Sequence, residues 1–245
     1  MSLPNNWDGN RVLARLGADD VARLRQHLRP IRLDYRQCLA AANRPITTVY
    51  FPLRGLVSIV AMSSNRRHEA EVGVIGCDGM TGSAIVLGAK ASPFNAFVQM
   101  EGDGLCLGAH ELIELIDDSL SLRRALLQYV NVFTVQMAET ALANARGNVI
   151  NRLARWLLLA HDRTAGDELR LTHEFLSVML GVRRAGVTSA LHELASRGVI
   201  SITRKSIVIK NRSGLEATSD GLYGAAEREL ARLLVPPAEP REYGR

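Results

Sequence analysis

The stretch from residue 171 to residue 210 constrains the fold more than any other part of the chain. It reads LTHEFLSVMLGVRRAGVTSALHELASRGVISITRKSIVIK. Thr172 suits a helix N-cap, apolar residues follow at spacings of three and four, and Gly181 suits the left-handed position that ends a helix. A second helix is expected from about residue 183 to 197, with Gly198 after it. The sequence therefore predicts two short helices joined by a glycine-bearing turn.

A β-hairpin with a basic tip is expected directly after the second helix. Isoleucine recurs at positions 200, 202, 207 and 209, on both sides of the polar run from Thr203 to Ser206, and such alternation is typical of paired strands. Residues 171–212 hold seven Lys or Arg against two Glu, a balance of +5 that equals the net charge of the whole chain. Helix, turn, helix and basic wing together indicate a motif that reads DNA.

This stretch resembles the C-terminal domain of the Crp/Fnr family of bacterial transcription regulators. Residues 149–160, VINRLARWLLLA, fit the helix that opens that domain, and the resemblance covers most of residues 29–210. It implies an α+β fold with a jelly-roll-like β-roll, a long dimerisation helix and a winged helix-turn-helix. The implied units are a cyclic-nucleotide-binding-like sensor domain at 1–120, the dimerisation helix and hinge at 121–146, the DNA-binding domain at 147–215 and a C-terminal tail at 216–245.

The resemblance also implies roles for individual residues of the DNA-binding domain. Arg184 matches the family's base-reading arginine, and Ser189 stands where the family has a second one. The other implied DNA contacts are Thr172, His173, Arg183, Thr203 and Lys205. These matches predict a homodimer that reads a palindromic operator through the helix at 183–197.

Residues 121–145 contain no Gly or Pro and return to helical periodicity. Apolar and polar side chains recur at alternating intervals of four and three, at Leu126, Val130, Phe133, Met137, Thr140 and Asn144. Such a row is typical of a parallel dimer seam and equally of a helix buried against its own β-roll. The family resemblance favours the dimer seam, in which the two polar residues would fix the register.

Residues 31 to about 110 predict a β-rich domain, because short apolar runs alternate with Gly, Pro and Asn. Family members that bind cyclic AMP use a Glu and an Arg in a cassette that matches residues 76–97 here. Ser83 stands near the position of the Glu, and Pro93 and Phe94 stand near that of the Arg. An apolar residue cannot neutralise a phosphate, so the usual binding of cyclic AMP is not expected, and the effector stays unidentified.

Four glycines in the same region recur every third residue, at Gly73, Gly76, Gly79 and Gly82. Glycines of this kind could let backbone N–H groups approach an anion, or retain a pocket for an unidentified ligand. They could also form turns and the start of a short helix within the β-roll. The spacing does not match a dinucleotide-binding fingerprint, and the turns are the favoured interpretation.

The remaining features exclude several classes of protein. No apolar run is long enough to span a membrane and no signal peptide is evident, so a cytoplasmic location and no membrane partner are expected. Cys38, Cys77 and Cys106 are widely spaced and argue against an iron–sulfur cluster. Neither the six histidines nor any nucleophile motif predicts an enzyme, a metal site or a cofactor.

The implied partners are double-stranded DNA, a second copy of the chain, RNA polymerase and an unidentified small-molecule effector. The alternative is a ligand-binding or protein-interaction module whose winged helix does not read DNA. The two differ in salt dependence, because binding to nucleic acid releases counterions and weakens steeply as salt rises. Operator sequence, target genes and the sign of regulation do not follow from the sequence.

Overall fold

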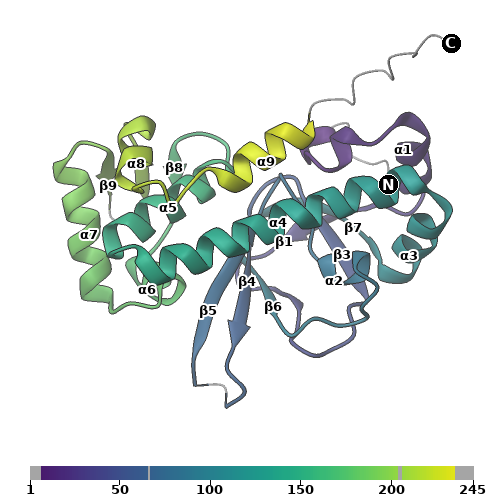
Figure 1. Cartoon of the computed structure of the whole chain (residues 1–245), viewed down its shortest axis with the longest axis horizontal. Coiled ribbons are helices and arrows are strands. Elements are labelled where there is room, and N and C mark those ends of the chain that lie inside the picture. Colours follow the sequence, from purple (N-terminus) through teal and green to yellow (C-terminus); the bar gives the residue numbers. More distant parts are fainter. Residues whose placement is uncertain (1–6, 66, 204–205, 235–245) are drawn as a thin grey trace, which may run out of the picture.

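A computed structural model describes residues 7–65, 67–203 and 206–234 of the chain. The longest helix, α4 (Leu120–Arg146), runs along the molecule. The strands lie beneath one part of α4, and the helices of the C-terminal half gather at its end (Figure 1). This arrangement is a mixed α+β fold, as predicted.

Two antiparallel sheets form the N-terminal domain, with strand orders β2-β6-β4-β5 and β1-β7-β3. Their bounds are β1 Arg29–Leu33, β2 Cys38–Ala40, β3 Thr48–Pro52, β4 Leu56–Met62, β5 Glu69–Ile75, β6 Asn95–Met100 and β7 Gly102–Gly108. Phe51 and Leu105 of one sheet share a buried core with Val57 and Val98 of the other. Because alternate side chains point to opposite faces of a strand, each sheet contributes one apolar face to this core.

Short helices close the ends of the β-roll and lead into α4. They are η1 Trp7–Gly9, η2 Leu13–Arg15, α1 Ala18–Arg25, α2 Ser83–Val86 and α3 Ala109–Asp118. The hydroxyl of Ser119 accepts a hydrogen bond from the backbone N–H of Leu122 and so caps α4. The 27 residues of α4 continue without a break to Gly147, and the helical character expected for this segment is confirmed.

The C-terminal half contains the predicted pair of helices and the wing. Its elements are α5 Val149–His161, β8 Glu168–Leu169, α6 His173–Leu180, α7 Arg184–Ser196, β9 Ile200–Ile202, β10 Ile207–Ile209, α8 Arg212–Thr218 and α9 Ala225–Leu234. Thr172 caps α6 by accepting from the N–H of Phe175, and Gly181 ends it at φ 60°. The helix-turn-helix and hairpin predictions are therefore confirmed, whereas Arg204 and Lys205 at the wing tip lie outside the described residues.

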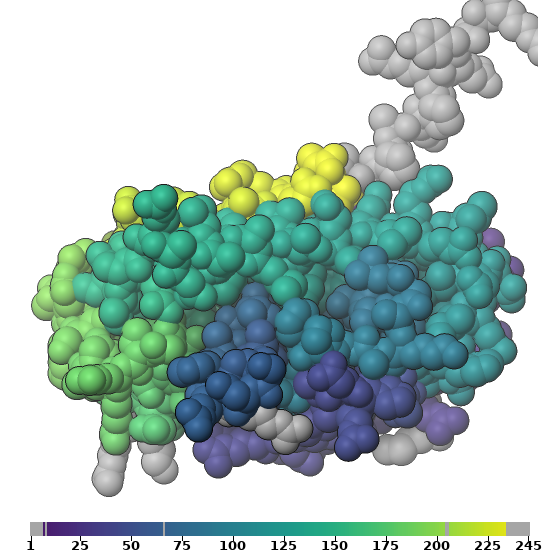
Figure 2. Space-filling model, turned by 60° about the horizontal axis from the view of Figure 1, so that its bottom comes forward, coloured from purple at the N-terminus to yellow at the C-terminus, as the bar shows by residue number. Residues whose placement is uncertain are grey.

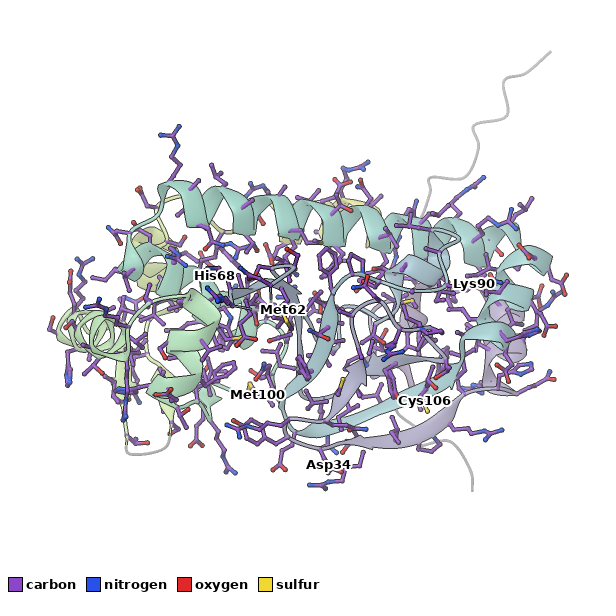
Figure 3. The ribbon with its side chains drawn as sticks, turned by 90° about the horizontal axis from the view of Figure 1, so that it is seen from below. Asp34, Met62, His68, Lys90, Met100 and Cys106 are labelled. Carbon is purple, nitrogen blue, oxygen red and sulfur yellow. The ribbon has the colours of Figure 1, made fainter. Side chains whose placement is uncertain are left out.

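The two halves of the molecule pack closely together. Leu56 and Val74 of the β-roll belong to the same apolar core as Trp156 of α5 and Leu176 of α6. The rings of Trp156 and Phe175 meet edge to face, with centroids 5.4 Å apart. Figure 2 shows the green C-terminal helices directly against the blue strands, and Figure 3 labels Met100 at this boundary.

Candidate nucleic-acid interface

The exposed face of α7 carries the arginines that the sequence singles out. Val187, Leu191 and Leu194 face the core, so the opposite face of the helix is free. Arg183 at the N-cap and Arg184 in the first turn are both exposed. Within the described residues, neither guanidinium lies within ion-pair distance of a carboxylate, whereas Arg197 after the far end of α7 pairs with Glu193. The start of α7 is thus a concentrated, uncompensated positive charge.

A groove of about 460 Å³ joins the start of α7 to α6 and the wing. Its lining brings together four of the predicted DNA contacts, at Thr172, His173, Arg184 and Thr203. Arg183 and Ser189 are exposed nearby on α7 but do not line the groove. Lys205, the seventh predicted contact, lies outside the described residues.

His173 is less free than the other residues of this groove. Its Nδ1 lies 3.0 Å from the hydroxyl oxygen of Thr188, and that hydroxyl also donates to the carbonyl of Arg184 at 3.1 Å. Partial burial lowers the pKa of His173, and the positive charge of Arg184 lowers it further. A neutral His173 therefore links α6 to α7 through Thr188, a connection that the spacing along the sequence does not reveal.

The predicted dimer seam on α4 is wrong for its apolar members. Leu126, Val130 and Phe133 are 1%, 7% and 6% exposed and belong to the core of the chain's own β-roll. Met137 is half-buried against the same core. The row of side chains at intervals of four and three is the inner face of the helix, so the alternative of a helix buried against its own β-roll is correct for these residues. Half-buried Thr140 and exposed Asn144 are untested as register residues.

A second row on α4 is exposed instead. Leu120 is 74% exposed and Leu127 is 42% exposed, and Thr134 and Ala141 continue the row at intervals of seven residues. Residues seven apart lie almost on one line along a helix. A groove of about 620 Å³ between α4 and α9 borders Leu120 and Leu127. This row was not among the predicted residues, although its seven-residue interval is present in the sequence.

The four regularly spaced glycines provide room for close packing. A Cβ atom on Gly73 would lie 2.8 Å from the Phe133 ring, and one on Gly76 would lie 2.5 Å from Cβ of Arg163. Gly79 faces Tyr129 in the same way, and Gly82 has a positive φ of 78° at the start of α2. These contacts explain the glycines without a phosphate, because β5 and the following turn press directly on α4 and on Arg163, which follows α5.

A cavity of about 290 Å³ lies between the β-roll and the inner face of α4. Ser83, Pro93 and Phe94, the residues that replace the family's Glu and Arg, line it. Val130, Phe133 and Met137 of α4 form its opposite wall. Among the lining residues none is charged. The exposed Lys90, labelled in Figure 3, lies between the lining residues Ala89 and Ala91 but does not itself line the cavity.

Glu71 is a buried carboxylate at the boundary between the two halves. Its Oε1 accepts a hydrogen bond of 2.5 Å from the indole N–H of Trp156, which belongs to α5. Its Oε2 accepts a hydrogen bond from the hydroxyl of Ser58 on the neighbouring strand. Burial raises the pKa of Glu71 to about 7 although both hydrogen bonds oppose that shift. A titratable group thus joins the β-roll to the C-terminal domain.

Other polar contacts hold α4 and the C-terminal domain against the β-roll. The amide of Gln136 accepts from the backbone N–H of Val74 at 2.7 Å and donates to its carbonyl at 3.1 Å, and so completes the edge of β5 as a neighbouring strand would. The guanidinium of Arg163 on the C-terminal side pairs with Asp78 of the β-roll at 2.6 Å, and both side chains are buried.

In the part of the chain that the structure describes, no helix is both long and apolar enough to cross a membrane. The same residues contain no cluster of three or more side chains suited to hold a metal ion.

Part of the C-terminal half matches a known family in sequence, and most of the chain matches known structures in fold. The family model of the Crp-like helix-turn-helix domain matches residues 151–218. FixK2 from Bradyrhizobium japonicum superposes with a TM-score of 0.65 at 16% identity, over 78% of this chain and 96% of that one. The Crp-family transcriptional regulator TTHB099 from Thermus thermophilus gives 0.63 at 16% identity, over 78% and 97%.

A further solved structure with this fold is the c-di-GMP-responsive regulator CLP from Xanthomonas campestris. It superposes with a TM-score of 0.60 at 21% identity, over 79% of this chain and 99% of that one. No curated protein matches the chain in sequence.

Proposed function

We propose that the chain is a DNA-binding transcription regulator of the Crp/Fnr type, which reads a palindromic operator as a homodimer, because it joins a Crp-like helix-turn-helix domain to the fold of the Crp/Fnr regulators. The observation that carries the proposal is the pair of exposed, uncompensated arginines at the start of α7. A two-fold dimer would present two such helices to successive major grooves, about 34 Å apart.

The exposed residues of the interface divide into two roles. Arg184 lines the groove between α6, α7 and the wing, and its planar guanidinium can donate two parallel hydrogen bonds to guanine O6 and N7. Arg183, Thr172 and Thr203 lie around it and suit phosphate oxygens. Ser189 is exposed one turn further along α7 but is too short for a second bidentate contact. Contact of Lys205 with phosphate rests on the sequence alone.

Arg184→Ala is expected to weaken operator binding by about 1–3 kcal/mol per half-site and to leave binding of random DNA nearly unchanged. Fluorescence anisotropy on an operator recovered from co-purified genomic fragments measures both affinities over a range of salt concentrations. Arg197→Ala is the matched control, because Arg197 lies after the other end of α7 and already pairs with Glu193.

Two results would contradict this assignment. An equal loss on operator and random DNA would make Arg184 a phosphate contact rather than a base reader. Affinity that does not fall as salt rises would contradict DNA binding itself and favour a protein-interaction module.

The homodimer is proposed to form through the exposed row of α4 at Leu120, Leu127, Thr134 and Ala141. Two large apolar side chains in this row are exposed to water, and a groove of about 620 Å³ between α4 and α9 lies beside them. Small residues at Ala138 and Ala141 allow close approach of two helices. RNA polymerase as a partner stays an expectation of the family resemblance, a cytoplasmic location stays an expectation of the sequence, and no catalytic role is proposed.

The effector of the sensor domain is proposed to be an uncharged, mainly apolar small molecule. A charged ligand in the cavity of about 290 Å³ would lack a counter-charge among its lining residues, and burial of an unpaired charge is costly. Apolar cavities of about 150 Å³ hold one benzene ring, so this one has room for about two rings. Asn95 is 7% exposed and lines the cavity.

The amide of Asn95 adds one polar requirement to the ligand. Its oxygen accepts from the N–H of Ala42 at 2.8 Å. Its Nδ2 is not among the fully buried polar atoms that lack a partner within the described residues, so it is open to water or to a ligand. A carbonyl or ether oxygen on the ligand would satisfy it.

The class of ligand can be tested with two small molecules of similar shape, of which one is neutral and the other is an anion. We expect 2-acetylnaphthalene to raise the melting temperature and the anion 2-naphthoate to have little effect, because a ligand at a hundred times its dissociation constant adds about 2.7 kcal/mol. Ser83→Phe, which enlarges a lining residue, is expected to reduce the shift. A larger shift with 2-naphthoate, or a shift with micromolar cyclic AMP, would contradict the proposal while leaving DNA binding unaffected.

A further inference from the structure

The C-terminal segment of residues 219–234 returns from the DNA-binding domain to the helix from which that domain began. The chain leaves α4 at Arg146, forms α5 to α8 and then runs back as α9. Figure 1 shows α9, in yellow, lying along α4. The DNA-binding domain is therefore attached to α4 at both of its ends rather than at Gly147 alone.

Apolar and polar contacts hold α9 on α4. Val132 of α4 is buried together with Ala226 and Leu230 of α9 in a small separate core. The carboxylate of Glu139 on α4 accepts from the backbone N–H groups of Ala225 at 2.7 Å and Ala226 at 3.2 Å. These N–H groups belong to the first turn of α9 and have no partner within that helix. Glu139, a residue of α4, therefore caps the start of α9.

The same segment covers the hinge. Leu222 is 9% exposed, and a Cβ atom on Gly147 would lie 2.7 Å from its Cδ1. Beside it, the amide nitrogen of Asn151 in the first turn of α5 donates to the carbonyl of Thr218 at 2.9 Å. Rotation about Gly147 would therefore have to displace the chain that leads into α9.

One buried side chain of α9 lacks hydrogen-bond partners. Both carboxylate oxygens of Glu227 are buried, and among the described residues neither has a hydrogen-bond donor. The nearest cation is Arg163, whose Nη1 lies 4.0 Å away and which is already paired with Asp78 of the β-roll. Burial raises the pKa of Glu227, which indicates that the environment disfavours its charge. The attachment of α9 is therefore weaker than its apolar contacts alone would make it.

We propose that residues 219–234 form a brace that fixes the orientation of the DNA-binding domain on α4, and that reorientation of this domain requires α9 to detach. A domain joined by one hinge can rotate about it, whereas a domain attached at two points cannot do so until one attachment opens. Local opening of a short surface helix costs less than unfolding of a core, so α9 is the attachment that opens.

Leu230→Asp places a charge in the small core between α9 and α4 and tests the brace in the full chain without DNA. We expect backbone amides of α9 and of residues 147–152 to exchange with deuterium at least about tenfold faster than in the unchanged protein. Trypsin should also cleave faster after Arg146 at the hinge. Arg228→Asp is the matched control, because it introduces the same residue at an exposed position of the same helix and should change neither rate.

Two further variants keep the test decisive if Leu230→Asp folds poorly. Glu139→Ala removes the cap, together with the charge that Glu139 presents to Arg155 and Glu227, and should accelerate hinge exchange in the same direction. Glu227→Gln removes the disfavoured charge with little change in shape and should slow it. The proposal would be overturned if amide exchange became faster only in α9 and stayed unchanged at residues 147–152 in all of these variants. In that case α9 would not restrain the hinge.

Discussion

Leu127→Asp is expected to convert the proposed homodimer into a monomer. Leu127 is 42% exposed in the single chain and lies at the centre of the exposed row of α4. In a two-fold seam the new carboxylate would be buried opposite its own symmetry mate, a cost of about 3 kcal/mol or more. That cost raises the dissociation constant at least about a hundredfold, which light scattering at micromolar concentration will detect.

Ile113→Asp provides the matched control for the seam. Ile113 is a similarly exposed apolar residue, at 39%, but belongs to α3 rather than α4. The control should stay dimeric. Because the row is exposed in the single chain, Leu127→Asp should leave the melting curve of the monomer nearly unchanged. A dimer that survives Leu127→Asp would place the interface on another surface.

The misplaced seam shows what helical periodicity cannot reveal. Both the inner row with Leu126 and Phe133 and the outer row with Leu127 and Thr134 repeat along α4 at helical spacing. The inner row is the more apolar because the β-roll covers it. A pattern in the sequence shows that a face is buried but not which partner buries it. The partner follows only from the fold.

The winged helix was predictable because its signals are local. Thr172 caps the helix that follows it, Gly181 adopts the left-handed conformation that glycine tolerates, and Ile200 alternates with Ile202 in a strand. Each of these depends on neighbours only a few residues away. The links between the domains are different in kind, since Glu71 and Trp156 are 85 residues apart. No spacing rule joins them, and the sequence did not indicate the pair.

Glu71→Gln is expected to stabilise the protein above pH 7 and to have little effect near pH 5. Burial raises the pKa of Glu71 from 4.5 to about 7, so between these values the folded chain binds a proton that the unfolded chain has released. The free energy of unfolding therefore falls as pH rises from 4.5 through 7, by on the order of 3 kcal/mol from this group. Glutamine cannot titrate, so it abolishes this loss.

The substitution also preserves the hydrogen bonds at the boundary between the domains. The amide oxygen can accept from Trp156, and the amide nitrogen can donate to the hydroxyl of Ser58. Urea unfolding from pH 5 to 8, followed by the fluorescence of Trp156 in a Trp7→Phe background, gives the difference in free energy at each pH. Glu168→Gln, at an exposed position of the C-terminal domain, should change stability by less than about 0.5 kcal/mol throughout.

A destabilising effect of Glu71→Gln at high pH would show that the arginines near Glu71 outweigh its burial. Arg155 and Arg163 both lower the pKa of Glu71, but less than burial raises it. If Glu71→Gln were destabilising at pH 8, the ionised carboxylate would be held by these arginines, and the pKa would lie below its ordinary value. If the expected sign is found, protonation of Glu71 strengthens the docking of α5 on the β-roll, because Trp156 belongs to α5. Solution pH would then act directly on the contact between the β-roll and the DNA-binding domain.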